Sequence, residues 1–350
     1  MDARARARDF CERYGLGAPV LEAPMAGACP PELAAEVVAA GGMGAAGVVN
    51  DPPETIASWA RRFRDLAGDA PFQLNLWVPD PPAESGDERA VAAFLDRLGG
   101  RATDTAGAGP EYAAQQQAVL DARPTVASSI MGLFDEAFVT ALHDAGVAWF
   151  ACATTLDEAL AAQRAGADAV VAQGIEAGGH RGTADPGLAT RTGVGTFALV
   201  PALADALSIP VVAAGGVADG RALAAALTLG ASAVQIGTTL LRTPEAGVDD
   251  GWAASLDGLP PERPVLTRAY TGRPARAVPT GYVRAWDDPH APDPAPYPQQ
   301  RRLVARYRAG EPGAVDRVNH WAGQAAGRAT ADPAREVVAR MWREAGALLP

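Results

Sequence analysis

His180 is the residue in this sequence with the clearest capacity for chemistry. It lies in the segment Gln-Gly-Ile-Glu-Ala-Gly-Gly-His-Arg-Gly, residues 173–182, and is one of only four histidines. Glycines on both sides free the backbone to aim the imidazole, and an imidazole with a pKa near ~6.5 can accept a proton at neutral pH. The pattern predicts a general base at His180. Glu176 could orient that ring or instead secure the loop, and the sequence leaves both open.

Two glycine-bearing segments have the composition of a phosphate site. Residues 214–220 read Ala-Gly-Gly-Val-Ala-Asp-Gly, and residues 235–239 read Gln-Ile-Gly-Thr-Thr. Where no side chain intervenes, backbone N–H groups can approach an anion closely, and the start of a following helix adds favourable dipole charge. A single Gly-Gly pair can simply mark tight packing, but two such segments in succession favour a phosphate.

The other polar residues expected near these segments are uncharged. The amides of Asn75 and Gln173 and the hydroxyl of Ser128 each lie within or at the end of an apolar run. Uncharged hydrogen-bonding groups beside a phosphate cradle suit a ligand with one phosphate and a polar ring, and FMN fits that description. The predicted FMN-binding residues are Pro24, Met25, Ala26, Asn75, Ser128, Gln173, Gly179, Gly215, Gly216, Gln235, Ile236, Gly237 and Thr238.

Several other kinds of site are excluded or disfavoured. All 30 basic residues are arginine, so no lysine is available for a Schiff base, a pyridoxal-phosphate anchor or a P-loop. Cys11, Cys29 and Cys152 are far apart without Cys-x-x-Cys spacing, so we expect buried apolar thiols and no metal site or disulfide framework. No Gly-x-Gly-x-x-Gly follows the first apolar run, which disfavours a Rossmann dinucleotide domain.

Charge and hydrophobicity limit the partners. The net charge of -11 and pI of about 4.9 argue against a nucleic-acid partner, because phosphate binding needs a dense basic surface. No apolar run approaches the ~20 residues of a membrane helix, so no membrane association is expected. Residues 1–13 carry arginines but lack the apolar stretch of a secretory signal, which makes a cytoplasmic location the expectation.

Eight short apolar runs, each followed by a helix-prone stretch, must position these residues. Continuous apolar runs are typical of parallel strands covered on both faces. Eight strand–helix units favour a closed (β/α)8 TIM barrel, whose site forms at the carboxyl ends of the strands. An open doubly wound sheet is the structural alternative. The expected strands are residues 20–25, 44–49, 72–78, 125–130, 148–153, 169–173, 210–214 and 233–236.

The expected helices carry recognisable start signals. Thr155 can cap a helix over residues 156–165, and Asp219 can cap one over 221–229. In the C-terminal third, Asp332 is a possible cap for residues 333–348, with Pro333 in the first turn. A further helical stretch is expected over residues 300–309, after a proline-rich segment at 287–299.

These signals divide the chain into two parts. Residues 1–241 form the predicted FMN-binding barrel, with insertions at about 79–123 and 178–196 that are too long for simple connections. Residues 242–350 form a smaller loop and helical region that we expect to cover the barrel mouth. Both insertions and this C-terminal region are therefore candidates for shaping a site.

Taken together, the motifs resemble those of the nitronate monooxygenase family, formerly called 2-nitropropane dioxygenases. The resemblance extends along nearly the whole chain. It implies bound FMN with Gly178 among its contacts, and a catalytic His at position 180. It also implies oxidation of alkyl nitronates by O2 to a carbonyl compound and nitrite, with nitroalkanes as further candidate substrates. The segments that carry it are residues 23–27, 173–182, 213–217, 235–238, 268–276 and 321–324.

Two alternatives remain open at this point. Flavin-dependent enoyl reductases and NADH:quinone reductases carry a similar Glu-Ala-Gly-Gly-His stretch, so an NAD(P)H-dependent reductase of an enoyl thioester or quinone is the second hypothesis. The sequence shows no separate nicotinamide-binding signature. The third hypothesis is a non-catalytic barrel that binds a phosphorylated ligand. The expected partners are a small-molecule substrate and O2, and the expected state is a monomer or homodimer.

Overall fold

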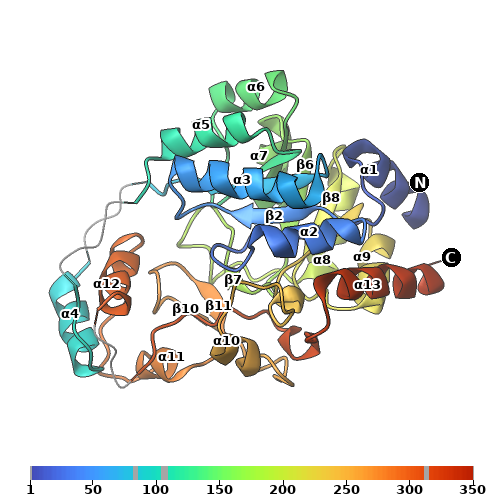
Figure 1. Ribbon diagram of the computed structural model, residues 1–350. Coiled ribbons are helices and arrows are strands. Elements are labelled where there is room, and N and C mark those ends of the chain that lie inside the picture. Colours follow the sequence, from blue (N-terminus) through green and yellow to red (C-terminus); the bar gives the residue numbers. More distant parts are fainter. Residues whose placement is uncertain (1, 82–85, 104–108, 311–314, 350) are drawn as a thin grey trace.

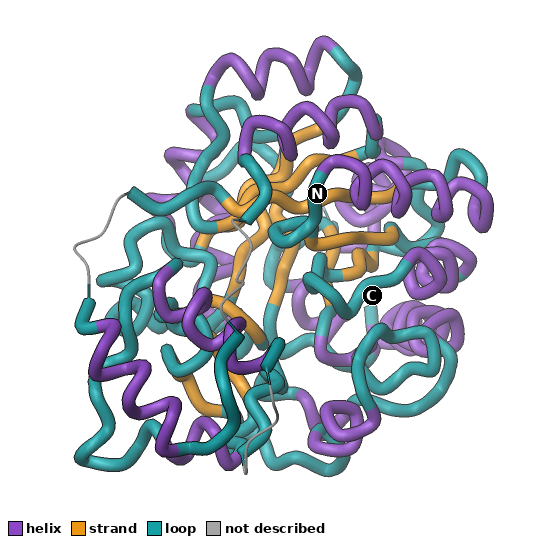
Figure 2. The backbone as a smooth tube through the Cα atoms, turned by 60° about the vertical axis from the view of Figure 1, so that its left-hand side comes forward, coloured by secondary structure: helices purple, strands orange, loops and turns teal. Residues whose placement is uncertain are grey.

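Eight parallel strands form a closed barrel at the centre of the molecule, which confirms the predicted (β/α)8 architecture (Figures 1 and 2). The computed structural model describes residues 2–81, 86–103, 109–310 and 315–349. The strands occur in the order β1-β9-β8-β6-β5-β4-β3-β2, and a parallel bridge between Leu21 and Met43 joins β1 to β2. They are β1 (Val20–Glu22), β2 (Gly44–Gly47), β3 (Phe72–Trp77), β4 (Val126–Ile130), β5 (Ala148–Ala153), β6 (Ala169–Gln173), β8 (Val211–Ala214) and β9 (Ala233–Ile236).

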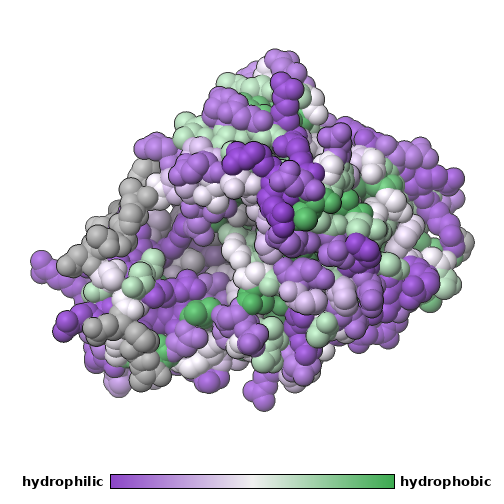
Figure 3. Space-filling view, viewed as in Figure 1, coloured by the Kyte–Doolittle hydropathy of each residue, from purple (hydrophilic) through white to green (hydrophobic). Residues whose placement is uncertain are grey.

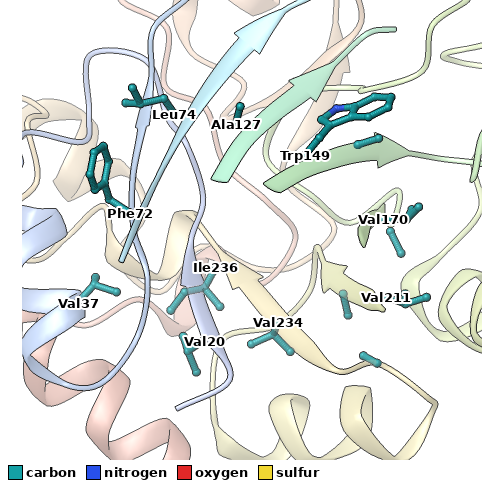
Figure 4. Packing of buried hydrophobic residues seen from close by; sticks show 14 of the residues in the cluster. Val20, Val37, Phe72, Leu74, Ala127, Trp149, Val170, Val211, Val234 and Ile236 are labelled. Carbon is teal, nitrogen blue, oxygen red and sulfur yellow. The ribbon is translucent and has the colours of Figure 1, made fainter. Parts of the chain in front are cut away.

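The core lies between these strands and the helices around them. Alternate strand residues such as Val20, Phe72 and Val170 point outward and pack against helix residues such as Val37 (Figure 4). Since both strand faces are buried, most strand residues are apolar. The surrounding helices are α2 (Pro31–Ala39), α3 (Pro53–Ala67), α5 (Tyr112–Ala122), α6 (Glu136–Asp144), α7 (Leu156–Arg164), α8 (Thr196–Ala206) and α9 (Gly220–Thr228).

The amino end of the barrel is closed by helix α1 (Ala3–Tyr14). Phe10 and Tyr14 on this helix pack against Phe150 inside the barrel, with ring centroids 6.1 and 5.1 Å apart. Aromatic side chains bury large apolar areas, so this end of the barrel is filled. The opposite end, where the strands finish, carries the cavity described below.

Two of the three predicted helix caps are confirmed and one is wrong. The Thr155 hydroxyl accepts a hydrogen bond from Glu158 N, and the Asp219 carboxylate accepts one from Ala222 N. Asp332 caps nothing, because its carboxylate instead accepts hydrogen bonds from Thr330 and Arg340. Helix α13 (Ala334–Leu348) begins after Pro333 without a side-chain cap. A neighbouring guanidinium thus outcompetes the helix N-terminus for this carboxylate.

Glu22, at the end of β1, is a fully buried carboxyl group inside the barrel. One of its oxygens accepts a hydrogen bond from Ala45 N at 2.8 Å, and the other has no hydrogen-bond partner among the described residues. Burial raises the pKa of Glu22 to about 8, although Cys29 and the Ala45 N–H act in the opposite direction. The side chain is therefore mainly protonated in the folded protein at neutral pH.

This raised pKa predicts an unusual dependence of stability on pH. Between about pH 4.5 and 8 the folded protein keeps a proton that the unfolded chain loses, so the contribution of Glu22 to stability declines as pH rises. We expect the isosteric Glu22→Gln to remove this decline. The difference in unfolding free energy between Glu22→Gln and the wild type should grow by more than about 1 kcal/mol from pH 5 to pH 8. Urea denaturation at the two pH values measures it, and a constant difference contradicts the prediction.

The C-terminal region contains the expected helices but also a small sheet that the sequence analysis did not predict. Its strands β10 (Val265–Thr267) and β11 (Ala275–Ala277) pair antiparallel, and β11 pairs with β7 (Gly179–His180), in the insertion at 178–196. Strands of two or three residues are too short to show alternation.

The helices of this region and of the first insertion form two separate packing groups. α12 (Gln299–Arg308) packs against α4 (Glu88–Arg97), whereas α13 packs against α9 and α2 outside the barrel. Helix α13 therefore lies away from the cavity, whereas residues before it, such as Thr271 and Trp321, line the cavity. The covering role of the region and its boundary at residue 241 stay predictions. The remaining short elements are η1 (Thr238–Leu240), α10 (Asp250–Ser255), α11 (Gly281–Ala285) and η2 (Ala326–Arg328). No described helix is long and apolar enough to cross a membrane.

Candidate active site

A cavity of about 500 Å³ lies at the carboxyl ends of the barrel strands, within the ~300–1,000 Å³ range of small-molecule sites. Figure 3 shows this face hollowed between the barrel and the region of α12, with a mostly hydrophilic surface around it. The structure brings all the predicted site residues together, although their roles stay predictions. Lining the cavity are His180, Pro24, Met25, Ala26, Asn75, Ser128, Gln173, Gly178, Gly179, Gly215, Gly216, Gln235, Ile236, Gly237 and Thr238.

The backbone of His180 is held from two sides. In β7 it pairs with Ala275 of β11, and its carbonyl oxygen accepts a hydrogen bond from Gln173 Nε2 at 3.0 Å. His180 therefore lies on a strand fixed between the barrel and the C-terminal region. The sequence suggested a glycine-rich loop here, and the strand partner comes from almost 100 residues further along the chain.

Aromatic residues and one hydroxyl surround the imidazole of His180. The rings of Trp77 and Trp321 stand 4.6 and 4.9 Å from it, centroid to centroid. Its Nε2 lies 2.8 Å from Thr271 Oγ1, and that hydroxyl can donate its only hydrogen to the Arg273 carbonyl. This pairing favours the tautomer that carries its proton on Nε2 and keeps a lone pair on Nδ1.

The imidazole is uncharged in this environment. Burial, together with the positive charges of Arg273 and Arg301, lowers the pKa of His180 to about 3. Because the protonated form is disfavoured, the ring is unprotonated throughout the neutral range.

Glu176 secures the loop and does not orient His180. Both carboxylate oxygens accept hydrogen bonds from Thr196 N, at 3.0 and 2.9 Å, and one also accepts from the Thr196 hydroxyl. This settles the alternative that the sequence left open. The orienting partner of His180 is Thr271.

A buried ion pair fixes the segment that carries Thr271. Arg273 is 1% exposed and pairs with Asp80 through its Nε and Nη2 atoms. Its guanidinium also donates to the carbonyl oxygens of Thr183 and Ala184, at 2.9 and 3.1 Å. A fully satisfied buried arginine of this kind imposes geometry more than it adds net stability. It ties three separate segments together beside the cavity.

Three glycines that line the cavity, Gly178, Gly215 and Gly216, form a close backbone cradle. Gly215 and Gly216 adopt φ values of 101° and 77°, which L side chains rarely adopt. At Gly178 a Cβ atom would stand 2.5 Å from Gly323 N and 2.8 Å from Thr238 Oγ1. Only glycine fits these positions.

The cradle also presents free donors. Within the described residues, the backbone N–H groups of Gly216, Gly237 and Thr238 donate to no protein acceptor. Gly237 and Thr238 are half-buried, and N–H groups in such positions almost always have a partner, so an acceptor belongs in this part of the cavity. Unpaired N–H groups at glycines match the chemistry of a phosphate.

The amide side chains expected to bond a ligand ring are partly engaged within the protein. Gln173 Oε1 accepts hydrogen bonds from Arg181 Nη1 and Gly182 N, while its Nε2 donates to His180. Asn75 Nδ2 donates to both the hydroxyl and the carbonyl oxygen of Ser128. Gln173 thus positions its neighbours in addition to lining the cavity.

Several lining residues escaped the sequence analysis. Thr271 and Trp321 lie inside segments singled out there, but nothing indicated that they face His180. Arg301 lies on the polar helix α12, and nothing in the sequence indicated that it reaches the site. The missed lining residues with side chains suited to chemistry or ligand contact include Asn50, Trp77, Cys152, Trp252, Tyr270, Thr271, Arg301, Arg308, Asn319 and Trp321.

Comparisons with known proteins agree on one family. A family model described as nitronate monooxygenase matches residues 11–344. The chain is 38% identical to a nitronate monooxygenase of Paraburkholderia phytofirmans, covering 94% of this chain and 93% of that one. It is 37% identical to a nitronate monooxygenase of Pseudomonas aeruginosa, covering 96% and 98%.

Two solved structures extend the comparison. A nitroalkane oxidase from Streptomyces ansochromogenes superposes with a TM-score of 0.85 at 34% identity, over 97% of this chain and 98% of that one. FabK from Thermotoga maritima superposes with a TM-score of 0.74 at 25% identity, over 97% and 96%. The first is the more similar of these two in both fold and sequence.

Proposed function

Since the chain belongs to the nitronate monooxygenase family, we propose that it is an FMN-dependent enzyme that oxidises alkyl nitronates with O2. Two nitronate anions and one O2 balance to two carbonyl compounds and two nitrite ions. The observation that carries the proposal is a single cavity that joins a glycine cradle to an uncharged His180 between aromatic rings. The part of the cavity around His180, Trp77 and Trp321 is called the aromatic end. The cradle suits a phosphate, and the aromatic end suits a small alkyl group.

The residues present fit FMN. The free N–H groups of Gly216, Gly237 and Thr238 would hold its phosphate, and Asn75 and Gln235 would lie beside its ring. The chemistry that FMN supplies when bound is electron transfer from the nitronate to O2. The protein provides the surroundings for that chemistry.

The side chains of the aromatic end have separate tasks. His180 Nδ1 accepts a carbon-bound proton when the substrate arrives as a neutral nitroalkane. Thr271 holds the ring in the orientation and tautomer that leave this atom free. Trp77 and Trp321 line the space around the alkyl group and exclude water, which strengthens electrostatic interactions inside.

An anaerobic experiment tests the proposal. The purified protein should carry FMN, and ethyl nitronate added without O2 and without nicotinamide should bleach the flavin absorbance. Admitting air should restore the absorbance and release nitrite. Bleaching by NADH or NADPH but not by nitronate would overturn the proposal in favour of a reductase. A protein that neither contains nor takes up FMN would overturn it in favour of a phosphate-binding barrel.

A further inference from the structure

The aromatic end of the cavity is bordered by a cationic side chain with no role so far. Arg301 reaches the cavity from α12, and its charge is strong enough at His180 to contribute to the lowered pKa of that ring. Its Nη1 donates to the Tyr297 hydroxyl at 3.1 Å. Tyr297 in turn packs against Trp77, with ring centroids 5.8 Å apart. Arg301 is thus positioned at the same end of the cavity as His180.

The charge of Arg301 is not neutralised locally. In the described part of the chain, no carboxylate lies within ion-pair distance of its guanidinium. The other charged lining residues among those described are Glu176 and Arg308. Glu176 is bound to Thr196, and Arg308 is occupied by the Asn319 amide oxygen. The charges that lower the pKa of His180 are both positive, those of Arg273 and Arg301, so with His180 uncharged the aromatic end has a positive potential.

We propose that Arg301 is the substrate-binding cation, and that it selects small organic anions over their neutral acids. The proposal rests on the proposed function, since it concerns the same site. A nitronate spreads its negative charge over two coplanar oxygens, and a planar guanidinium donates two parallel hydrogen bonds to such a group. A neutral nitroalkane carries the same two oxygens on nitrogen but no net negative charge. It therefore gains far less binding free energy from the guanidinium.

The test compares Arg301→Gln, Arg301→Lys and a control, Arg302→Gln. Arg302 is the next residue on the same helix, is exposed and does not line the cavity. Loss of a charge-assisted hydrogen bond predicts a roughly 10- to 100-fold higher KM for ethyl nitronate in Arg301→Gln. Arg301→Lys should recover part of the loss, and Arg302→Gln should match the wild type. The KM for neutral nitroethane should change much less.

A binding measurement separates this proposal from the proposed function. Propionate has the size and the two-oxygen anion of ethyl nitronate but cannot be oxidised, so calorimetry on the flavin-loaded protein reports anion binding without turnover. Arg301→Gln should weaken propionate binding by a similar factor. If the wild type oxidises nitronates and Arg301→Gln leaves both the KM and propionate binding unchanged, the Arg301 assignment is overturned while the function stands. Equal losses in Arg302→Gln would overturn it as well.

Discussion

Replacing His180 by Asn is expected to reduce the turnover of neutral nitroalkanes by ~10²- to 10⁴-fold, the usual contribution of a general base. The same variant should keep a substantial share of nitronate oxidation. A neutral nitroalkane must lose a carbon-bound proton before it can give up electrons, whereas a nitronate is already ionised. Steady-state rates with nitroethane and ethyl nitronate, prepared separately, measure the difference.

The pKa of His180 adds a second observable. Because that pKa lies near 3 in the free protein, the imidazole is unprotonated at pH 5 and above. We expect kcat/KM for nitroethane to show no decline near pH 6.5, where an ordinary histidine would begin to lose activity on acidification. Proton transfer leaves a nitronate anion beside the ring, and its charge favours the imidazolium in the complex.

His143→Asn is the matched control, since His143 lies on α6 and pairs with Asp168 outside the cavity. It should leave both activities unchanged. Equal loss of both activities in His180→Asn, with FMN content unchanged, would assign His180 to binding the anion instead of taking the proton. No loss with either substrate would show that the histidine has no catalytic role.

Replacing Gly237 by Val is expected to weaken FMN binding by about 10- to 100-fold, because it removes one or two charge-assisted hydrogen bonds to the phosphate. A Cβ atom at position 237 would stand 3.1 Å from both Ala23 Cβ and Met25 Sδ. The branched side chain therefore crowds Ala23 and Met25 and displaces the β9 loop whose N–H groups would hold the phosphate. The backbone at Gly237 has a negative φ of −119°, outside the left-handed region reserved for glycine, and thermal denaturation of the apoprotein checks that the variant folds.

Titration of the apoprotein with FMN and with riboflavin identifies the phosphate contribution. Riboflavin lacks the phosphate, so Gly237→Val should reduce its affinity much less than that of FMN. Gly346→Val serves as a control, because a Cβ at that position of α13 would meet nothing within 4 Å. Equal weakening of both ligands would show that the phosphate does not bind at the β9 loop. Full FMN occupancy in the variant would contradict the assignment entirely.

Local patterns in the sequence were sufficient to predict the barrel. The eight apolar runs and the Thr155 and Asp219 caps depend on neighbours within a few residues, and the structure confirms them. The glycine cradle was visible for the same reason. Every site residue predicted at the strand ends reaches the cavity, because a closed parallel barrel brings all carboxyl ends of its strands to one rim. His180 could be singled out because its glycine neighbours lie beside it in the chain.

The immediate surroundings of His180 depended on the tertiary structure alone. Thr271, Trp321 and Arg301 lie about 90 to 140 residues beyond it in sequence, and only the pairing of β7 with β11 and the packing of α12 bring them near. The pKa of the ring, its tautomer and the sign of the potential around it arise from burial and from charges on distant segments. The sequence by itself thus determined that a base can sit at the barrel mouth. The tertiary structure decided that this base is uncharged and that a cation faces its substrate.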